Sequence, residues 1–258
     1  MGHESFSAAF LLTSIAGLST GIGSTIAYFI RKPKKIHLTF SLGFSAGVMI
    51  YVSFMELFPK GLESGNKVMS IAAFFIGVIF IGSIDLFVPE RDNPHHYKGY
   101  AGTDTINRDQ KLERTGIFTA LAIAIHNFPE GLATFAAAYS DIKLGIIIAL
   151  SIAIHNIPEG ISVSMPIYYA TGSRKKAFLY SFLSGTSEPI GAAIGFLILI
   201  PFLSQGLFAF LLPFIAGIMV YIALDEILPT AHRYGHGHTV ILGVVLGMLI
   251  MALSLLIL

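Results

Sequence analysis

Two six-residue segments of this chain hold the side chains best suited to chemistry. Residues 126–131 read HNFPEG, and residues 155–160, which begin 29 positions later, read HNIPEG. Each segment places an imidazole, a carboxamide and a carboxylate in strongly apolar surroundings. One ionisable side chain at the centre of a bilayer helix costs about 2.5–3.5 kcal/mol on insertion scales. A chain that accepts this cost twice, with the same residues, is expected to bind a divalent metal ion there.

The composition excludes a soluble domain and a thiolate metal site. The chain has 258 residues, of which 54% are hydrophobic and 12% are charged, and its mean hydropathy is +0.76. These values are typical of a membrane protein with many spans. There is no cysteine, so any metal ligands must be nitrogen or oxygen atoms, apart from a methionine thioether.

A helix needs about 20 apolar residues to cross the hydrocarbon core. On this basis we predict an all-α polytopic membrane protein that forms a single transmembrane domain, residues 1–258. The eight predicted transmembrane helices are residues 6–30, 38–58, 68–88, 115–139, 144–168, 176–200, 206–227 and 239–258.

Lysine and arginine concentrate in cytoplasmic loops, which gives the orientation. The first, third, fifth and seventh connections hold 13 of the 16 basic residues. We therefore place these connections in the cytoplasm and both termini outside. Residues 89–114 are predicted to be a flexible cytosolic loop.

The two histidines are expected at the same depth. His126 and His155 each lie 11 residues along their spans, which at 1.5 Å per residue is about 16 Å and close to the midplane. In each segment the His and Glu are four residues apart and share a helix face. The proposed convergent ligands are His126, Glu130, His155 and Glu159, with Asn127 and Asn156 alongside.

Three prolines accompany these polar residues. Pro129 and Pro158 cannot donate a backbone hydrogen bond, so we expect each to open its helix beside the ligands. The sixth span contains Ser187-Glu188-Pro189, which adds a third midplane carboxylate. Glu188 could serve one enlarged site or a second adjacent ion.

The second and seventh spans both end in a Glu-x-x-Pro pattern, although they end on opposite sides of the membrane. This recurrence indicates a 3+2+3 inverted repeat, in which spans one to three match six to eight around spans four and five. The predicted path has Ser53 and Glu56 at its outer mouth and Asp225 and Glu226 at its inner mouth.

These features resemble the ZIP (Zrt/Irt-like) metal transporters, and more narrowly their bacterial ZupT-like branch, over essentially the whole chain. The resemblance rests on AIHNFPEGLATF and AIHNIPEGISVSMPIYYATGS, the eight spans, the outside termini and the long loop after span three. It implies a bacterial plasma (inner) membrane protein that imports Zn²⁺, and often Fe²⁺, Mn²⁺, Co²⁺ or Cd²⁺. It also implies that spans one, four, five and six move against the rest.

The same resemblance implies a two-metal site between spans four, five and six. By position, the first metal site takes His126, Glu130, His155 and Glu159. The second takes Asn127, Asn156 and Glu188 and shares Glu130 and Glu159.

Two other classes compete with transport. An intramembrane metal-dependent hydrolase would use its metal to activate water, but the chain has no His-Glu-x-x-His pattern. A di-iron carboxylate bundle would need Glu-x-x-His pairs on a soluble scaffold.

We expect divalent ions and the lipid bilayer as partners, not nucleic acid, and the chain is compatible with a homodimer. A short histidine-rich tract is either a weak metal site or a solvated turn: His232, His236 and His238.

Overall fold

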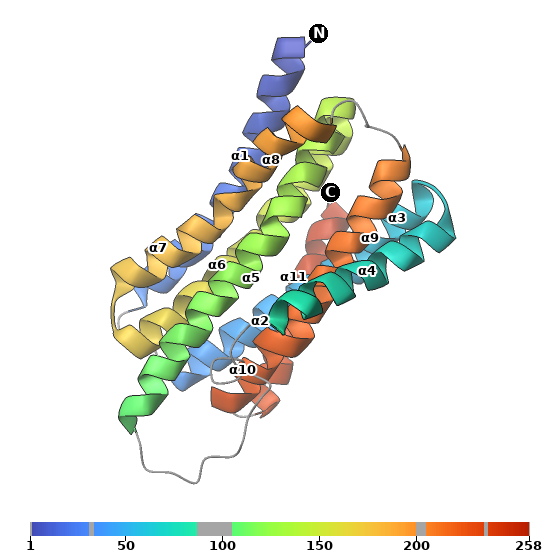
Figure 1. Ribbon diagram of the computed structural model, residues 1–258. Coiled ribbons are helices and arrows are strands. Elements are labelled where there is room, and N and C mark those ends of the chain that lie inside the picture. The colour runs from blue at the N-terminus through green and yellow to red at the C-terminus, as the bar shows by residue number, and fades with distance from the viewer. Residues whose placement is uncertain (1, 31–33, 87–104, 200–204, 235–236, 258) are drawn as a thin grey trace.

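The computed structural model describes residues 2–30, 34–86, 105–199, 205–234 and 237–257, and these ranges form helices joined by short turns (Figure 1). In chain order the elements are α1 (Gly2–Phe29), α2 (Lys35–Val52), the π-helical turn η1 (Ser53–Leu57), α3 (Phe58–Glu63), α4 (Lys67–Asp85), α5 (Thr105–Ser140), α6 (Ile142–Thr171), α7 (Arg174–Gly185), α8 (Ser187–Leu199), α9 (Gln205–Ile222), the π-helical turn η3 (Ala223–Ile227), α10 (Leu228–Tyr234) and α11 (Gly237–Ile257).

The chain is a polytopic α-helical membrane protein. Within the described residues, six helical stretches are long and apolar enough to cross a membrane. They are Ser5–Phe29, Lys35–Glu63, Lys67–Asp85, Gly145–Thr171, Gly206–Arg233 and Gly237–Leu256. Each corresponds to one of the segments predicted from hydropathy.

The two other predicted spans are also helical, with different boundaries. Helix α5 has 36 residues and begins at Thr105, inside the segment predicted as a loop; residues 89–104 of that segment lie outside the described part of the chain. Helices α7 and α8 have 12 and 13 residues and meet at Thr186. Neither is long enough to span a bilayer alone.

The helix irregularities lie beside other prolines than those expected. Helices α5 and α6 remain α-helical through Pro129 and Pro158. The π turns instead precede Pro59 and Pro229. In η1 the N–H of Phe58 donates to the carbonyl of Ser53, five residues back, and η3 ends in the same way. A π turn widens the helix just before a residue that cannot donate.

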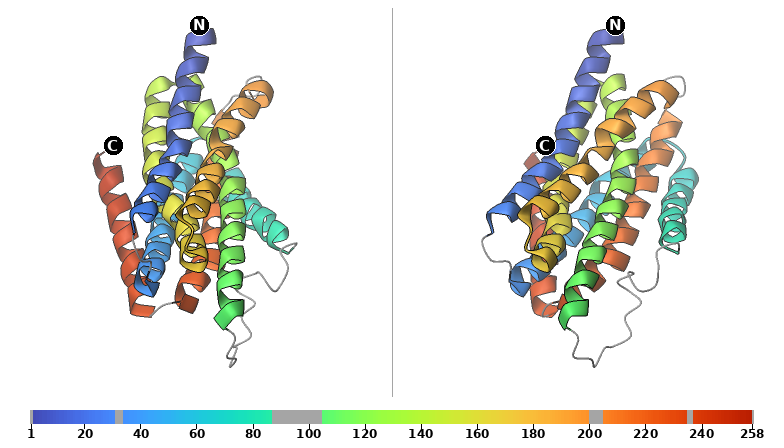
Figure 2. Two further views of the ribbon diagram at one scale, coloured as in Figure 1. Left: turned by 90° about the vertical axis from the view of Figure 1, so that its left-hand side faces the viewer. Right: turned by 60° about the vertical axis from the view of Figure 1, so that its left-hand side comes forward.

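The helices form two groups. Helices α1, α7 and α8 pack against the antiparallel pair α5–α6, whereas α2 packs against α11 and α9 against α4 (Figure 1, Figure 2). The two groups meet mainly where α2 contacts α6 and where α9 contacts α5. We call them the α5–α6 group (α1 and α5–α8) and the α2–α9 group (α2–α4, α9–α11, η1 and η3).

Reciprocal glycines hold helices together inside each group. A Cβ atom built on Gly217 would lie 2.0 Å from the carbonyl oxygen of Phe74, and one built on Gly77 would lie 2.1 Å from that of Phe214. Only glycine, whose side chain is a hydrogen atom, fits between backbones this close. The two helices α4 and α9 are therefore in close van der Waals contact. The same arrangement joins α2 to α11, α1 to α6 and α5 to α8, through Gly47 and Gly247, Gly23 and Gly160, and Gly131 and Gly191.

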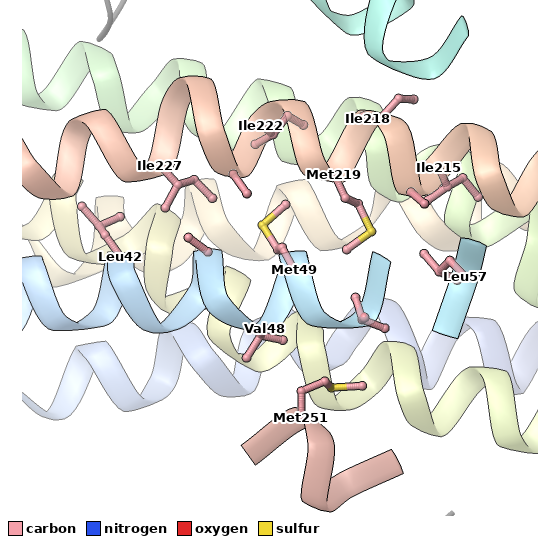
Figure 3. Close-up of a cluster of buried hydrophobic side chains, with 14 of the residues drawn as sticks. Leu42, Val48, Met49, Leu57, Ile215, Ile218, Met219, Ile222, Ile227 and Met251 are labelled. Atoms are coloured by element: carbon pink, nitrogen blue, oxygen red, sulfur yellow. The ribbon is translucent and has the colours of Figure 1, made fainter. Parts of the chain in front are cut away.

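Apolar side chains fill the space between α2 and α9. Met49 and Met219 are fully buried there, and Figure 3 shows both pointing between the two helices. The cluster continues to Ala133 of α5 and Met165 of α6. This apolar cluster is therefore mainly the interior of the α2–α9 group, and it reaches the α5–α6 group at residues such as Ala133 and Met165.

The glycine crossings lead to the first prediction. Gly217→Ala would force α4 and α9 apart, and overpacking of this kind costs about 1–3 kcal/mol. Purified protein in detergent should therefore unfold at a lower temperature than the wild type. Gly237→Ala is the control, because its nearest neighbour would be His232 at 3.9 Å. Equal midpoints for the two variants would contradict this account of the packing.

Candidate metal centre

Helices α5 and α6 bring the two six-residue segments side by side. His126 and Glu130 lie on α5, and His155 and Glu159 lie on α6. All four side chains have 0% exposure. Because the helices are antiparallel, the histidine of each segment lies opposite the glutamate of the other.

The result is a crosswise pairing. Nε2 of His126 lies 3.0 Å from Oε1 of Glu159. Nε2 of His155 lies 3.3 Å from the carboxylate of Glu130 and 3.9 Å from Oε1 of Glu159. Each imidazole thus contacts the carboxylate of the neighbouring helix at hydrogen-bonding distance. Two buried carboxylates are balanced by two groups that can carry a proton or coordinate a metal.

Helix α8 adds a third carboxylate beside this pair. Glu188 is fully buried in the first turn of α8, and Oε1 of Glu188 accepts a hydrogen bond from the side-chain amide of Asn156. The same amide donates to the carbonyl oxygen of Ala16 on α1, at 2.9 Å. Asn156 therefore ties α1, α6 and α8 together at the level of the histidines.

Several buried polar atoms at this level have no hydrogen-bond partner among the described residues. They include Oε2 of Glu159, Oε2 of Glu188, Oδ1 of Asn156 and both amide atoms of Asn127. Buried polar groups are normally satisfied, so such a concentration of free oxygen atoms needs an explanation. A bound cation would provide one.

The described side chains do not form a closed ring of ligands. No group of three or more His, Asp or Glu residues among them already surrounds a position for a metal ion. The geometry is instead that of two His–Glu pairs lying next to each other.

The predicted mouth residues are not among the contacts of these pairs. Ser53 is buried and donates to the carbonyl of Met49, while Glu56 forms an ion pair with Lys60. Asp225 and Glu226 are partly buried on η3. In the histidine-rich tract, His232 and His238 are exposed, and His236 lies outside the described residues.

Two polar residues near the site were not predicted from the sequence. Ser151 precedes His155 by one turn of α6, and a Ser-x-x-x-His spacing is visible in the sequence. Thr20 of α1 meets Gly160 where the two helices cross. Both hydroxyl groups are buried and have no partner among the described residues. Nothing in the sequence near Thr20 marks it, because its neighbours come from distant segments.

A multispan helical bundle with a buried nitrogen-and-oxygen centre defines a membrane protein of the metal-transporter class. Residues 88–255 match the sequence profile of the ZIP Zinc transporter family. Similar proteins include the zinc transporter ZupT of Clostridium perfringens, 55% identical, with 96% of this chain and 95% of that protein aligned. The zinc transporter ZupT of Streptococcus mutans is 52% identical, with 96% of both chains aligned.

This chain therefore belongs to the ZIP zinc transporter family. It is a transporter rather than an enzyme, so the hydrolase alternative is set aside, as is the di-iron carboxylate protein. Its relatives are bacterial, and it has several membrane-spanning helices. It is a multi-pass protein of the bacterial plasma membrane.

The second prediction contrasts the two asparagines in metal-free buffer with a chelator. Asn156→Leu removes a hydrogen bond from a buried carboxylate, which costs about 1–3 kcal/mol, so the unfolding temperature should fall. Asn127→Leu gives up no hydrogen bond to a described residue and should leave that temperature unchanged or raise it. Thermal unfolding of the purified variants measures both, and equal losses would contradict the assigned contacts.

Proposed function

We propose that this chain carries Zn²⁺ across the membrane into the cytoplasm, and that the His–Glu pairs of α5 and α6 bind the ion on its way. The crosswise pairing of four fully buried ligand-type side chains is the observation that carries the proposal. The relatives are named as zinc transporters, which gives the substrate.

The distances within the pairs suit zinc. Zn–N bonds are about 2.0–2.1 Å and Zn–O bonds about 2.0–2.2 Å, so two ligand atoms on one tetrahedral ion lie about 3.4 Å apart. The observed separations are 3.0 and 3.3 Å. A zinc ion can therefore replace the shared proton of a pair with small side-chain movements. Nitrogen and oxygen ligands without thiolate also accept Fe²⁺, Mn²⁺, Co²⁺ and Cd²⁺.

A second ion beside the first is proposed for Asn127, Asn156 and Glu188. Free oxygen atoms of these three side chains support it, since oxygen ligands and shared carboxylates suit a second divalent ion. Glu130 and Glu159 would bridge the two ions. In that arrangement the unpartnered oxygen atoms of the proposed ligands would each face a cation.

We further propose eight spans with an inverted repeat and both termini outside. The sequence of α2 and η1 recurs in α9 and η3 at a constant separation of 170 residues, with Phe44, Gly47, Met49, Glu56 and Pro59 matched by the same residue types. Gly77 of α4 and Gly247 of α11 obey the same separation. The repeat-related pairs α2–α11 and α9–α4 cross through matched glycines, which supports the proposal.

In the proposed path, a hydrated ion enters beside Glu56 and exchanges part of its water for the ligands of α5 and α6. It leaves past Asp225 and Glu226. The carboxylates attract the ion at both ends, and the apolar cluster between α2 and α9 excludes water between them.

The third prediction tests the site by substitution. Glu130→Ala and Glu159→Ala should each abolish uptake of radioactive zinc by metal-starved cells, because each removes a ligand and leaves an unpaired imidazole. Membrane levels of the variants must equal those of the wild type.

Phe128→Leu is the matched control, because it alters the same segment without touching a proposed ligand, and it should transport normally. Wild-type uptake by both glutamate variants would refute the proposed site.

The fourth prediction concerns pH. Carboxylates must be ionised and imidazoles neutral to bind a metal ion, so protons compete with zinc. The apparent KM for zinc in proteoliposomes should therefore rise as the external pH is lowered from about 7.5 to about 5.5, below the ordinary histidine pKa. An apparent KM that stays constant over this range would contradict ligation by these groups.

A further inference from the structure

A small hollow lies at the end of the bundle that holds the N-terminus, between η1–α3, α6 and α9. Its polar lining residues are Glu56, Lys60 and Ser151, and the rest of the lining is apolar, as at Ile152 and Leu212. The hollow thus lies on the boundary between the α5–α6 group and the α2–α9 group.

Glu56 and Lys60 face each other across one helical turn. The ammonium group of Lys60 contacts Oε1 of Glu56, and their side chains are only 27% (Lys60) and 12% (Glu56) exposed. A carboxylate bordered by apolar side chains needs a counter-charge, because burial removes most of its water. In this structure Lys60 supplies that charge.

Ser151 supplies a second polar group at the same place. Its side chain is 2% exposed and lines the hollow, and its Oγ has no hydrogen-bond partner among the described residues. It precedes His155 by four residues, which is about 6 Å along the axis of α6. The hollow therefore has a carboxylate at its mouth and a free hydroxyl group on the side towards the metal centre.

Lys60 has no equivalent in the second half of the repeat. The position that matches Glu56 is Glu226, but the position that matches Lys60 is Thr230. The Glu–Lys pair within one turn is therefore specific to this mouth of the proposed path.

We propose that Glu56 and Ser151 form a loading site for a hydrated divalent cation, and that Lys60 is a tethered cation which the metal must displace. The inference rests on the proposed zinc transport and adds the loading step and its selectivity. A tethered ammonium competes at a high effective concentration, so a monovalent ion at ordinary concentration rarely displaces it. A divalent ion carries twice the charge, so it binds Glu56 more strongly and displaces the ammonium group. Glu56 then has a counter-ion throughout the exchange.

The test measures zinc influx into proteoliposomes as a function of zinc chloride concentration. Lys60→Gln should lower KM about two- to five-fold, the range expected for loss of a partly exposed ion pair, with little change in kcat. It should also make influx sensitive to added sodium chloride. Lys60→Arg keeps the charge and should stay close to the wild type, whereas Glu56→Gln should raise KM.

Lys67→Gln is the matched control. Lys67 is exposed at the start of α4 and close in sequence, and its removal takes away one charge without unpairing Glu56. If Lys60→Gln leaves KM unchanged, or if Lys67→Gln lowers it equally, the tethered-cation proposal is overturned while zinc transport stands. Absence of zinc influx in the wild type would overturn both proposals.

Discussion

A carboxylate that leaves water for the interior of a helical bundle needs an opposite charge or a set of hydrogen-bond donors, because its hydration is otherwise lost. Three carboxylates lie fully buried at one level of this bundle, on Glu130, Glu159 and Glu188. Two imidazoles and the amide of Asn156 face them. This balance requires α5, α6 and α8 to lie close together and in one register. The surrounding helices pack against these three and hold them in place.

Glycine provides the closeness. Where α5 meets α8, Gly131 lies against the carbonyl of Glu188, and Gly191 lies against that of Phe128. Any larger residue there would move the carboxylate of Glu188 away from Asn156. The α2–α9 group has the same kind of glycine contact away from the polar centre. Close helix crossings are therefore common throughout this bundle and are not limited to the site.

Much of this arrangement could be predicted from the sequence, and the failures have physical causes. Hydropathy located the helical segments, because long apolar segments bounded by charged residues usually form membrane-spanning helices. The spacing of His126 and Glu130 identified the polar centre, but the crosswise pairing with Glu159 depends on how the antiparallel neighbour is rotated. The interruption at Thr186 and the two π turns each lie a few residues before a proline. Sequence rules predict a disruption at a proline, but they do not give the exact position or type of the irregularity, which depends on packing against neighbouring helices.

The residues that line the hollow also have recognisable spacings in the sequence. Glu56 and Lys60 have the spacing of a helical ion pair, and Ser151 lies one turn from His155. Neither signal is specific, because lysine is common at the ends of membrane spans and serine is common within them. Thr20 is different: its place beside Gly160 follows from a contact between distant segments, which one sequence without relatives does not reveal.

The distribution of close crossings also determines how this molecule can deform. In the described part of the chain, the glycines that meet a neighbouring backbone all join helices of the same group, either α1 with α5–α8 or α2–α4 with α9–α11. Across the boundary, the apolar cluster of the α2–α9 group meets side chains of the other group, such as Ala133 and Met165. Sliding along that boundary would therefore separate none of these glycine-mediated backbone contacts. The hollow beside Glu56 is lined by residues of both groups, so its shape depends on how the two groups are placed against each other.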